Sequence, residues 1–316
     1  MKNFLVILLL LLTFLPSPGQ DLSPSTGMQN MVLLHWENDI FLHTDYYFTN
    51  GAAVEFISPA VRIKAMDKLL YMPLKNGFAS HSISIRQNMY TPEKMFETDV
   101  QWNDRPYAGY FIGEYKLSQE TKRKKFSSGL SIGMLGEYSL AARTQDFVHS
   151  LDEMVPAAGW QYQVKNAPVI NLQSRYQEML VRNPIFDLQY GINGRIGSLY
   201  TDVSADATVR VGKRAGGFDF QTTGNRTTDF ECYLFMNAAS TLSYFDATLQ
   251  GSILNYHPSD HYFDNAERYM FVSKLSMGWV LAYNHLRLKA SLVHLTPEFK
   301  GGKSHGWGEI SLGVSF

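Results

Sequence analysis

Apolar and polar residues alternate along much of this chain with a period of two, the spacing of a β-strand with one apolar and one polar face. Residues 205–212 show the alternation clearly, and 186–195 and 286–291 repeat it. A soluble β-sandwich alternates as well, so no single segment decides between the two classes. Several alternating segments, however, reach about ten residues, the length that a tilted strand needs to cross a bilayer, against about 5–6 for a globular strand. The pattern therefore predicts a membrane-spanning β-barrel.

The end of the chain supports this prediction. Residues 309–316 alternate and finish on Phe316, an ending that resembles the last strand of bacterial outer-membrane barrels. Closure into a barrel leaves no strand edge unpaired in lipid. We predict an all-β, transmembrane, antiparallel β-barrel of about 12 strands, near residues 30–37, 49–58, 81–90, 106–118, 127–136, 171–180, 185–196, 202–212, 229–240, 268–282, 284–297 and 307–316.

Residues 243–252 would give a thirteenth strand. Single-chain bacterial barrels have an even number of strands, with both chain ends on one side, so we place this segment in a loop. The loops at one end then begin near residues 38, 91, 137, 197, 241 and 298, and the other end has tight turns near 182–184 and 283–285 and a long connection over 59–80.

The third of the six loops, residues 137–170, is the longest and contains a predicted helix. Ser139 suits an N-cap, and residues 140–154 are good helix formers. Gln145 and His149 are four residues apart and therefore share a face of this helix. We expect the helix to lie over the barrel mouth, with an apolar side formed by Phe147, Val148 and Leu151.

The first twenty residues are set apart from the barrel. Lys2 precedes a nearly unbroken apolar run over residues 4–15, and residues 16–20 are small or turn-forming. About twelve apolar residues are too few for a membrane-spanning helix, but they suit the core of a signal peptide better than a buried helix. We expect residues 1–20 to be a signal peptide that is removed, and residues 21–316 to form a single outer-membrane β-barrel domain.

Composition narrows the possible functions. The net charge of −1 gives no electrostatic case for binding nucleic acid. Cys232 is the one cysteine, which excludes an intramolecular disulfide and a cysteine-based metal site. Neither Gly-x-Ser-x-Gly nor His-Glu-x-x-His occurs, and this argues against common serine hydrolases and zinc proteases.

Three polar clusters interrupt the regular strands, within residues 37–51, 87–109 and 145–161. All three fall at the loop-bearing end of the predicted barrel. Their Asp, Asn and Thr oxygens are hard ligands that suit Ca²⁺ or Mg²⁺, and a histidine nearby is a base near neutral pH. Together these groups would suffice for metal-assisted ester hydrolysis. Each cluster taken alone is also ordinary turn chemistry, and that alternative stays open.

In order and spacing, these motifs resemble the outer-membrane lipid A 3′-O-deacylase family over nearly the whole of residues 21–316. No single motif is specific, but the combination on a chain with barrel patterning is. The markers are Glu37-Asn38-Asp39, Thr44-Asp45 with Phe48-Thr49-Asn50-Gly51, Asn103-Asp104-Arg105-Pro106-Tyr107-Ala108-Gly109, Gln145 with His149, Gly159-Trp160 with Gln163, and Thr296-Pro297-Glu298-Phe299-Lys300.

The resemblance implies a twelve-stranded, Ca²⁺-dependent enzyme that removes the 3′-linked acyloxyacyl chain from lipid A of lipopolysaccharide. By position, it implies that His149 is the general base and that Gln145 is its neighbour in the site. It further implies that Asn38 and Asp39 hold or orient the Ca²⁺ and that Thr49 lines the same cleft. The expected protein is a monomer in the outer membrane of a Gram-negative bacterium, with its site facing the outer leaflet.

Recognition of the substrate head group is less well defined by the resemblance. Arg105 lies in a matching motif and is a candidate substrate contact, and Lys94 is a second candidate in the same loop. The chain departs from the family pattern at Tyr46, where relatives often have Arg, at Phe48, where Tyr is usual, and at Glu137, which replaces a common Pro. These departures leave the proposed base and metal ligands intact but put head-group contacts in doubt.

Two other functions fit the same sequence. An outer-membrane phospholipase would also cleave an acyl ester at the membrane surface, and only the head group would differ. A non-enzymatic, narrow barrel would use charges such as Asp187, Arg195, Asp206 and Arg210 merely to fill its interior. Conductance in planar bilayers would favour a pore, whereas Ca²⁺-dependent ester cleavage would exclude a purely structural role.

Overall fold

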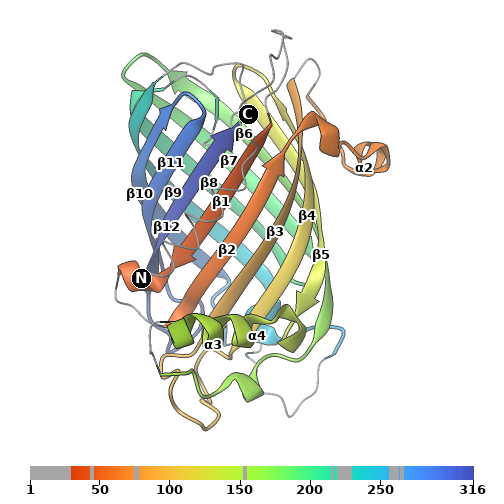
Figure 1. Cartoon of the computed structure of the whole chain (residues 1–316), viewed down its shortest axis with the longest axis vertical. Helices are drawn as coiled ribbons and strands as arrows, with labels where there is room; N and C mark the ends of the chain where they lie inside the picture. Colours follow the sequence, from red (N-terminus) through yellow and green to blue (C-terminus); the bar gives the residue numbers. More distant parts are fainter. Residues whose placement is uncertain are drawn as a thin grey trace.

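Twelve antiparallel strands close into a barrel (Figure 1). The computed structural model describes residues 30–42, 46–74, 78–151, 155–214, 217–218, 230–255, 263 and 267–316. Each strand pairs with its neighbours in sequence, and β1 also pairs with β12, which closes the sheet on itself. The predicted twelve-stranded barrel is confirmed. The predicted signal peptide, residues 1–20, lies outside the described residues, as do Thr44 and Asp45 of the family markers.

The strands are long, as the alternation predicted, and most reach beyond the predicted limits. They are β1 (Met31–Asn38), β2 (Tyr47–Ile57), β3 (Phe78–Thr91), β4 (Ala108–Glu120), β5 (Lys124–Leu135), β6 (Ala167–Arg182), β7 (Phe186–Gly197), β8 (Tyr200–Lys213), β9 (Glu231–Asp246), β10 (Phe271–Tyr283), β11 (Leu286–Leu295) and β12 (His305–Ser315).

The predicted loop over residues 243–252 is divided by the structure. Its first four residues extend β9 to Asp246, because they continue the pairing with β8 beyond the alternating segment seen in the sequence. The remainder forms α4 (Ala247–Gln250), which is capped by the Asp246 carboxylate accepting the Thr248 N–H at 2.8 Å. No thirteenth strand forms in the described ranges, and the tight turns at 182–184 and 283–285 are confirmed.

The two faces of the barrel wall have opposite character. Inside, Arg210 pairs with Asp187 at 2.8 Å, and the neighbouring strands contribute further pairs such as Arg175 with Asp206. Outside, the alternate residues are large and apolar, as expected for a strand with a period of two. The exposed apolar side chains on the strands include Val54, Ile83, Ile85, Ile132, Ile170, Ile192, Val203, Leu234 and Met277.

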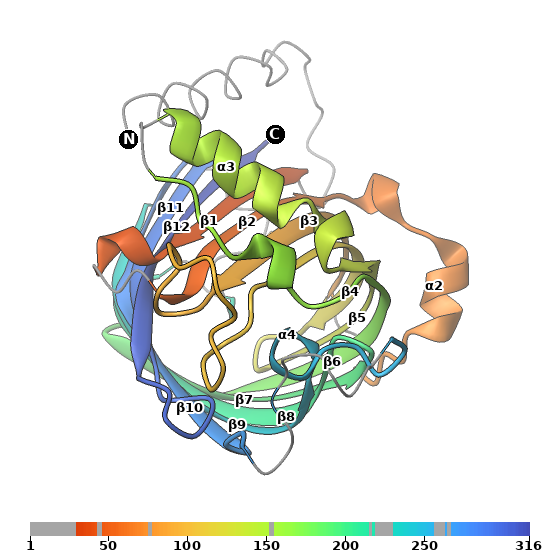
Figure 2. The same ribbon diagram turned by 90° about the horizontal axis from the view of Figure 1, so that it is seen from below.

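Two helices, α3 (Ala141–Leu151) and α2 (Lys64–Leu69), lie at opposite ends of the barrel (Figure 1). We call the end that carries α3 the α3 rim and the end that carries α2 the α2 end. Near α2, Leu70 packs with Tyr115 and Leu117 on the outside of β4, and Met66 packs against this cluster. At the α3 rim, α3 runs beside the mouth of the barrel (Figure 2). No helix in the described ranges is long and apolar enough to cross a membrane.

The predicted third-loop helix is confirmed, although α3 begins at Ala141 rather than at residue 140. Leu140 has a φ of 61°, so it lies outside the helical region and the helix starts after it. The Ser139 hydroxyl accepts the N–H of Ala141 at 3.3 Å, which is close to the capping role predicted for it. Residues 152–154, where the helix was predicted to end, lie outside the described residues.

The close packing of α3 against β4 depends on Gly109. A Cβ atom at this position would lie 2.3 Å from Ala141 Cβ and 2.5 Å from Ser139 Oγ. Gly109 faces outward, because its neighbour Tyr110 lines the interior of the barrel. The helix therefore packs against the outer surface of the wall at its rim.

We expect Gly109→Val to displace α3 while leaving the barrel closed, because the added side chain would occupy the position of Ala141. Limited proteolysis within residues 137–166, compared with heat-dependent gel mobility, measures the two effects separately. Gly113→Val is the matched control, since a Cβ at this outward position of the same strand approaches no described atom closer than 3.9 Å. Equal protection of the loop in both variants would contradict this role of Gly109.

Candidate functional site

Helix α3 turns polar side chains toward the protein. Ala141, Gln145 and His149 follow each other at intervals of four, so they share one face, and all three are buried, with Gln145 at 3% and His149 at 8% exposure. Phe147, which the sequence assigned to an apolar side, is 57% exposed. The helix therefore buries Gln145 and His149 while it exposes Phe147 together with the polar Arg143, Asp146 and Ser150.

The ring of His149 is held by a backbone carbonyl. Its Nδ1 lies 2.8 Å from the carbonyl oxygen of Val155. A carbonyl oxygen only accepts hydrogen bonds, so Nδ1 carries the proton and Nε2 keeps its lone pair. The buried ring therefore has one nitrogen fixed to the protein and one nitrogen able to take a proton.

Gln145 is oriented by Trp160, which follows Gly159 in one of the family markers. The Trp160 indole Nε1 donates to Gln145 Oε1 at 2.6 Å. The other end of the amide, Nε2, is buried and has no hydrogen-bond partner among the described residues. Because a buried amide without acceptors is unfavourable, this nitrogen is suited to donate to a group that enters the site from outside the chain.

Strands β1 and β2 supply the second group of predicted residues. Asn38 donates through Nδ2 to the carbonyl of Thr49 at 3.1 Å and accepts the Ile40 N–H at 2.9 Å. Thr49 lies at a bulge in β2, and its hydroxyl is 2.8 Å from that of Thr91 on β3. Asp39 follows in the short 3₁₀ turn Asp39–Phe41 and is buried. The structure therefore joins Asn38 and Thr49 directly.

Strand β3 connects the two groups. Met89 faces Asn50 of β2 in the pairing register, and it packs with Ala141 and Trp160 of the third loop. Residues of β3 that alternate with Met89, such as Tyr90, line the interior, so Met89 lies on the outer wall. The pairs Asn38 with Thr49 and Gln145 with His149 therefore both lie on the outer side of the wall at the α3 rim, where α3 runs beside the ends of β1, β2 and β3 (Figure 2).

The donor set of the first strand fits a hard cation. Asp39 offers a buried carboxylate, and Asn38 an amide oxygen with a second lone pair. These are the oxygen ligands that Ca²⁺ prefers, whereas zinc prefers nitrogen and sulfur. In the described part of the chain, no three His, Cys, Asp or Glu side chains form a cluster that would hold a metal by themselves. A Ca²⁺ ion at Asp39 would thus depend on neutral oxygens, water or a ligand.

The two residues assigned to head-group recognition lie elsewhere. Arg105 is buried on the inner side of β3, with its guanidinium 4.2 Å from the centre of the Tyr90 ring. It pairs with Glu298 and donates to Thr248 Oγ1 at 2.7 Å. These contacts tie three loops of the α3 rim together. Lys94 is exposed and pairs with Glu97 at 3.0 Å.

Three further residues support the site: sequence analysis named Trp160 and Tyr107 only as parts of family markers and assigned no role to Thr91. Thr91 is fully buried against Thr49, Trp160 orients Gln145, and the Tyr107 hydroxyl donates to the Met95 carbonyl at 2.6 Å. Burial raises the pKa of Tyr107 to about 12, so it remains a donor at neutral pH. Antiparallel pairing of the second and third strands was the one signal that would have placed Thr91 beside Thr49.

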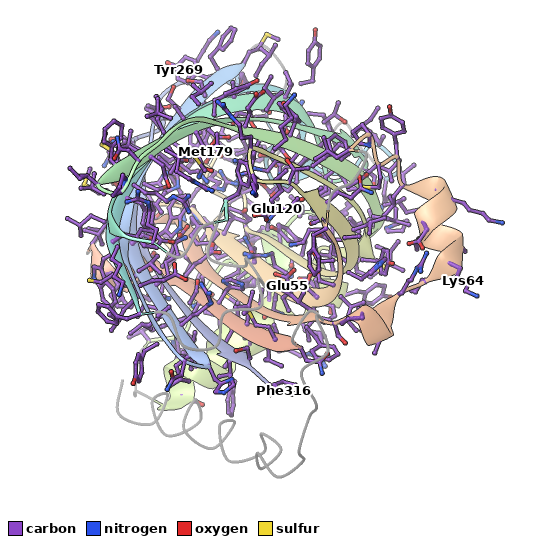
Figure 3. All side chains as sticks on the ribbon, turned by 90° about the horizontal axis from the view of Figure 1, so that it is seen from above. Glu55, Lys64, Glu120, Met179, Tyr269 and Phe316 are labelled. Carbon is purple, nitrogen blue, oxygen red and sulfur yellow. The ribbon has the colours of Figure 1, made fainter. Side chains whose placement is uncertain are left out.

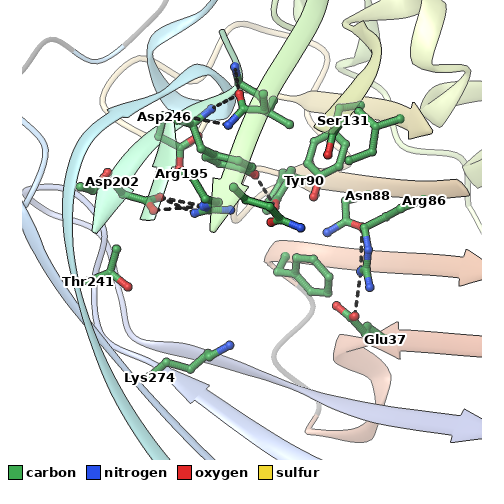
Figure 4. Close-up of a pocket in the computed structure, with 18 of the residues that line it drawn as sticks. Glu37, Arg86, Asn88, Tyr90, Ser131, Arg195, Asp202, Thr241, Asp246 and Lys274 are labelled. Atoms are coloured by element: carbon green, nitrogen blue, oxygen red, sulfur yellow. Dashed lines mark hydrogen bonds and ion pairs between the residues drawn. The ribbon is translucent and has the colours of Figure 1, made fainter. Parts of the chain in front are cut away.

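The barrel interior contains a separate cavity of about 570 Å³ near the α3 rim (Figure 4). Glu37 pairs with Arg86 at 2.9 Å, and Arg195 pairs with Asp202 across the same cavity. The lining charges thus largely neutralise one another, as predicted for a filled interior. The interior cavity holds none of the predicted catalytic residues, which lie on the other side of the wall.

A closed barrel with a charged interior and an apolar outer surface defines the class of outer-membrane β-barrel proteins. Within that class, a family model described as "Outer membrane protein LpxR" matches residues 5–316. The chain therefore belongs to the LpxR outer membrane protein family. No curated protein sequence is similar enough to match it.

Two solved structures are similar to this chain to different degrees. LpxR from Salmonella typhimurium is 16% identical, with a TM-score of 0.74, and the match covers 90% of this chain and 100% of that chain. The β-domain of the Bordetella autotransporter BrkA is 8% identical over 92% of this chain and 99% of that chain, with a TM-score of 0.44. The likeness to the Salmonella protein establishes the twelve-stranded fold.

The contact with Val155 predicts the tautomer of His149. In protein labelled with ¹⁵N-histidine, the neutral form of the His149 ring should carry its proton on Nδ1 and none on Nε2, because the carbonyl accepts from Nδ1. The signal lost in His149→Gln identifies the residue. Protonation of Nε2 instead would contradict the geometry described for the ring.

Proposed function

We propose that this protein is a Ca²⁺-dependent ester hydrolase that removes the 3′-linked acyloxyacyl chain from lipid A of lipopolysaccharide. The observation that carries the proposal is the position of Gln145 and His149, which are buried polar residues on the outer wall of a membrane barrel. A lipid reaches this wall sideways, with its acyl chains still in the bilayer. Membership of the LpxR family supports the same assignment.

In this mechanism His149 is the general base. Nε2 takes a proton from a water molecule as the water oxygen attacks the ester carbonyl. The hydrogen bond from Nδ1 to Val155 fixes the ring and stabilises the imidazolium that forms. The imidazolium then returns the proton to the departing sugar oxygen, so water is divided between a sugar hydroxyl and a free fatty acid.

Gln145 assists by donating a hydrogen bond. Its Nε2 would point its N–H groups at the substrate ester, where negative charge develops on the carbonyl oxygen. Trp160 contributes by holding Oε1, so that the amide cannot rotate and present its oxygen to that charge. This arrangement makes use of the one amide nitrogen in the site that is buried without an acceptor.

Asp39 and Asn38 would hold the Ca²⁺, with Thr49 lining the same cleft. A bound Ca²⁺ would stabilise negative charge on the ester oxygen during attack. Asp39 supplies the anionic ligand, and the bond from Asn38 to the Thr49 carbonyl fixes the end of β1 against β2. Water and substrate oxygens would complete the roughly six to eight ligands that Ca²⁺ takes.

The proposed orientation places the α3 rim at the outer leaflet of a Gram-negative outer membrane. Exposed apolar side chains on this rim, including Phe147, Leu140 and Tyr138, would then meet lipid. Residues 1–20 would serve as the signal peptide for export, and the barrel would act as a monomer. Arg105 and Lys94 remain the proposed head-group contacts, although the contacts of Arg105 favour a role in joining loops.

We expect His149→Gln to lower deacylation at least a hundredfold, because the general base is lost. Mass spectrometry of lipid A from a Gram-negative host measures loss of the acyloxyacyl unit. His285→Gln, an exposed histidine at the α2 end, is the matched control and should retain activity. Wild-type cleavage by His149→Gln in a folded barrel would exclude His149 as the base.

The same extracts distinguish the alternative functions. Release of fatty acid from phospholipid, with lipid A unchanged, would identify an outer-membrane phospholipase. If a correctly folded wild-type barrel cleaves neither lipid when purified and supplied with Ca²⁺, the non-enzymatic barrel would be the better interpretation.

We expect Asp39→Asn to raise the Ca²⁺ concentration for half-maximal activity by about tenfold or more, because an anionic ligand becomes neutral. Titration of free Ca²⁺ with isolated membranes measures this shift. Asp99→Asn removes an exposed carboxylate from a loop of the same rim and is the control. An unchanged Ca²⁺ requirement in Asp39→Asn would place the ion elsewhere.

A further inference from the structure

A second cavity, of about 730 Å³, lies at the α2 end of the barrel, away from the proposed catalytic site. It is formed by the turn between β4 and β5 and the turn between β6 and β7. Figure 3 looks onto this end, with Met179, which lines the cavity, labelled beside the opening and Lys64 on α2. The charged residues that line the cavity are Lys122, Arg123, Arg182, Arg214 and Asp187.

The cavity carries an excess of positive charge. Asp187 is already satisfied by two guanidinium groups, those of Arg210 at 2.8 Å and Arg214 at 2.9 Å. Arg123 donates to the carbonyl oxygens of Met179 and Leu180, and Arg182 to that of Gly217. Lys122, Arg123 and Arg182 are exposed, and none of the three forms an ion pair with a described carboxylate.

An apolar surface adjoins these cations. Leu180 is 48% exposed and Val181 is 39% exposed, and both line the cavity at a bulge in β6. Along the outward face of β6 the next positions are Glu178, Tyr176 and Ser174, so this apolar surface is confined to Leu180 and Val181 at the end of the strand. Leu180 and Val181 therefore give the cavity an apolar side next to its cations.

Two tyrosines indicate where the cavity lies relative to the hydrocarbon core of the membrane. Tyr176 of β6 and Tyr190 of β7 are in edge contact, and both hydroxyls donate to Glu178, at 2.6 and 3.1 Å. Tyrosines with apolar rings and hydrated hydroxyls gather where a barrel leaves the hydrocarbon. The cavity lies beyond them, at the turns, and so at the level of the lipid head groups.

We propose that this cavity binds the phosphate of an anionic phospholipid, with the acyl chains lying along Leu180 and Val181. Guanidinium and ammonium groups bind phosphate strongly, and basic pockets at the membrane edge are typical head-group sites. The exposed Leu180 and Val181 beside the cations favour a lipid over a soluble phosphate. Only the identity of the leaflet rests on the proposed function: with the α3 rim outside, the site takes lipid from the periplasmic leaflet.

Native mass spectrometry of the full-length barrel in detergent tests this site with dioleoylphosphatidylglycerol as the probe. We expect the wild type to bind this lipid about tenfold more tightly than dioleoylphosphatidylcholine. The double variant Lys122→Gln/Arg182→Gln should bind dioleoylphosphatidylglycerol about tenfold more weakly than the wild type does. Lys64→Gln/Lys68→Gln removes the same charge from exposed positions on α2 at the same end and should bind like the wild type.

The single variant Lys122→Gln keeps the test valid if the double variant misfolds, because it changes only an exposed turn residue. Its affinity for dioleoylphosphatidylglycerol should fall about threefold. Equal loss in the α2 control would overturn the proposal in favour of general surface charge. Equal binding of the two lipids, or displacement of phosphatidylglycerol by millimolar inorganic phosphate, would also overturn it. These readouts involve no ester cleavage, so their failure is distinct from failure of the proposed hydrolase activity.

Discussion

Pairing of β1 with β12 is the contact on which the rest of the structure depends. Eight consecutive residue pairs join Met31–Asn38 to the last strand. Backbone N–H and C=O groups in a bilayer have no water to bind, so a sheet survives there only when its first and last strands satisfy each other. Closure also fixes which side of every strand faces inward, and so decides the surroundings of every side chain on the wall.

The distribution of charge follows from closure. Inside, Arg and Lys side chains of one strand meet Asp and Glu of the next, as in the contacts of Arg210 and Arg214 with Asp187. A charge in a confined interior is stable only when it is paired or hydrated. Outside, the wall is apolar except near its two ends, and the two sites inferred for this protein lie at those ends.

Both sites are places where the chain brings polar groups to the membrane edge. At the α3 rim, a helix buries Gln145 and His149 and exposes Phe147. At the α2 end, basic residues stand beyond Leu180 and Val181. A site on the outer wall is open to lipids from the side, whereas one in the ion-paired interior would be open only from the ends.

The sequence by itself determined the strand number and the long third loop, and it placed Gln145 and His149 on one face of a helix, because alternation and helical spacing are local properties of the chain. It did not determine which face of α3 is buried, because that depends on the packing of the third loop against Met89 and Tyr107. Nor did it identify Thr91 beside Thr49 or the inward contacts of Arg105 with Glu298. Only the tertiary structure decided these, because each contact joins segments that closure and loop packing bring together from distant parts of the chain.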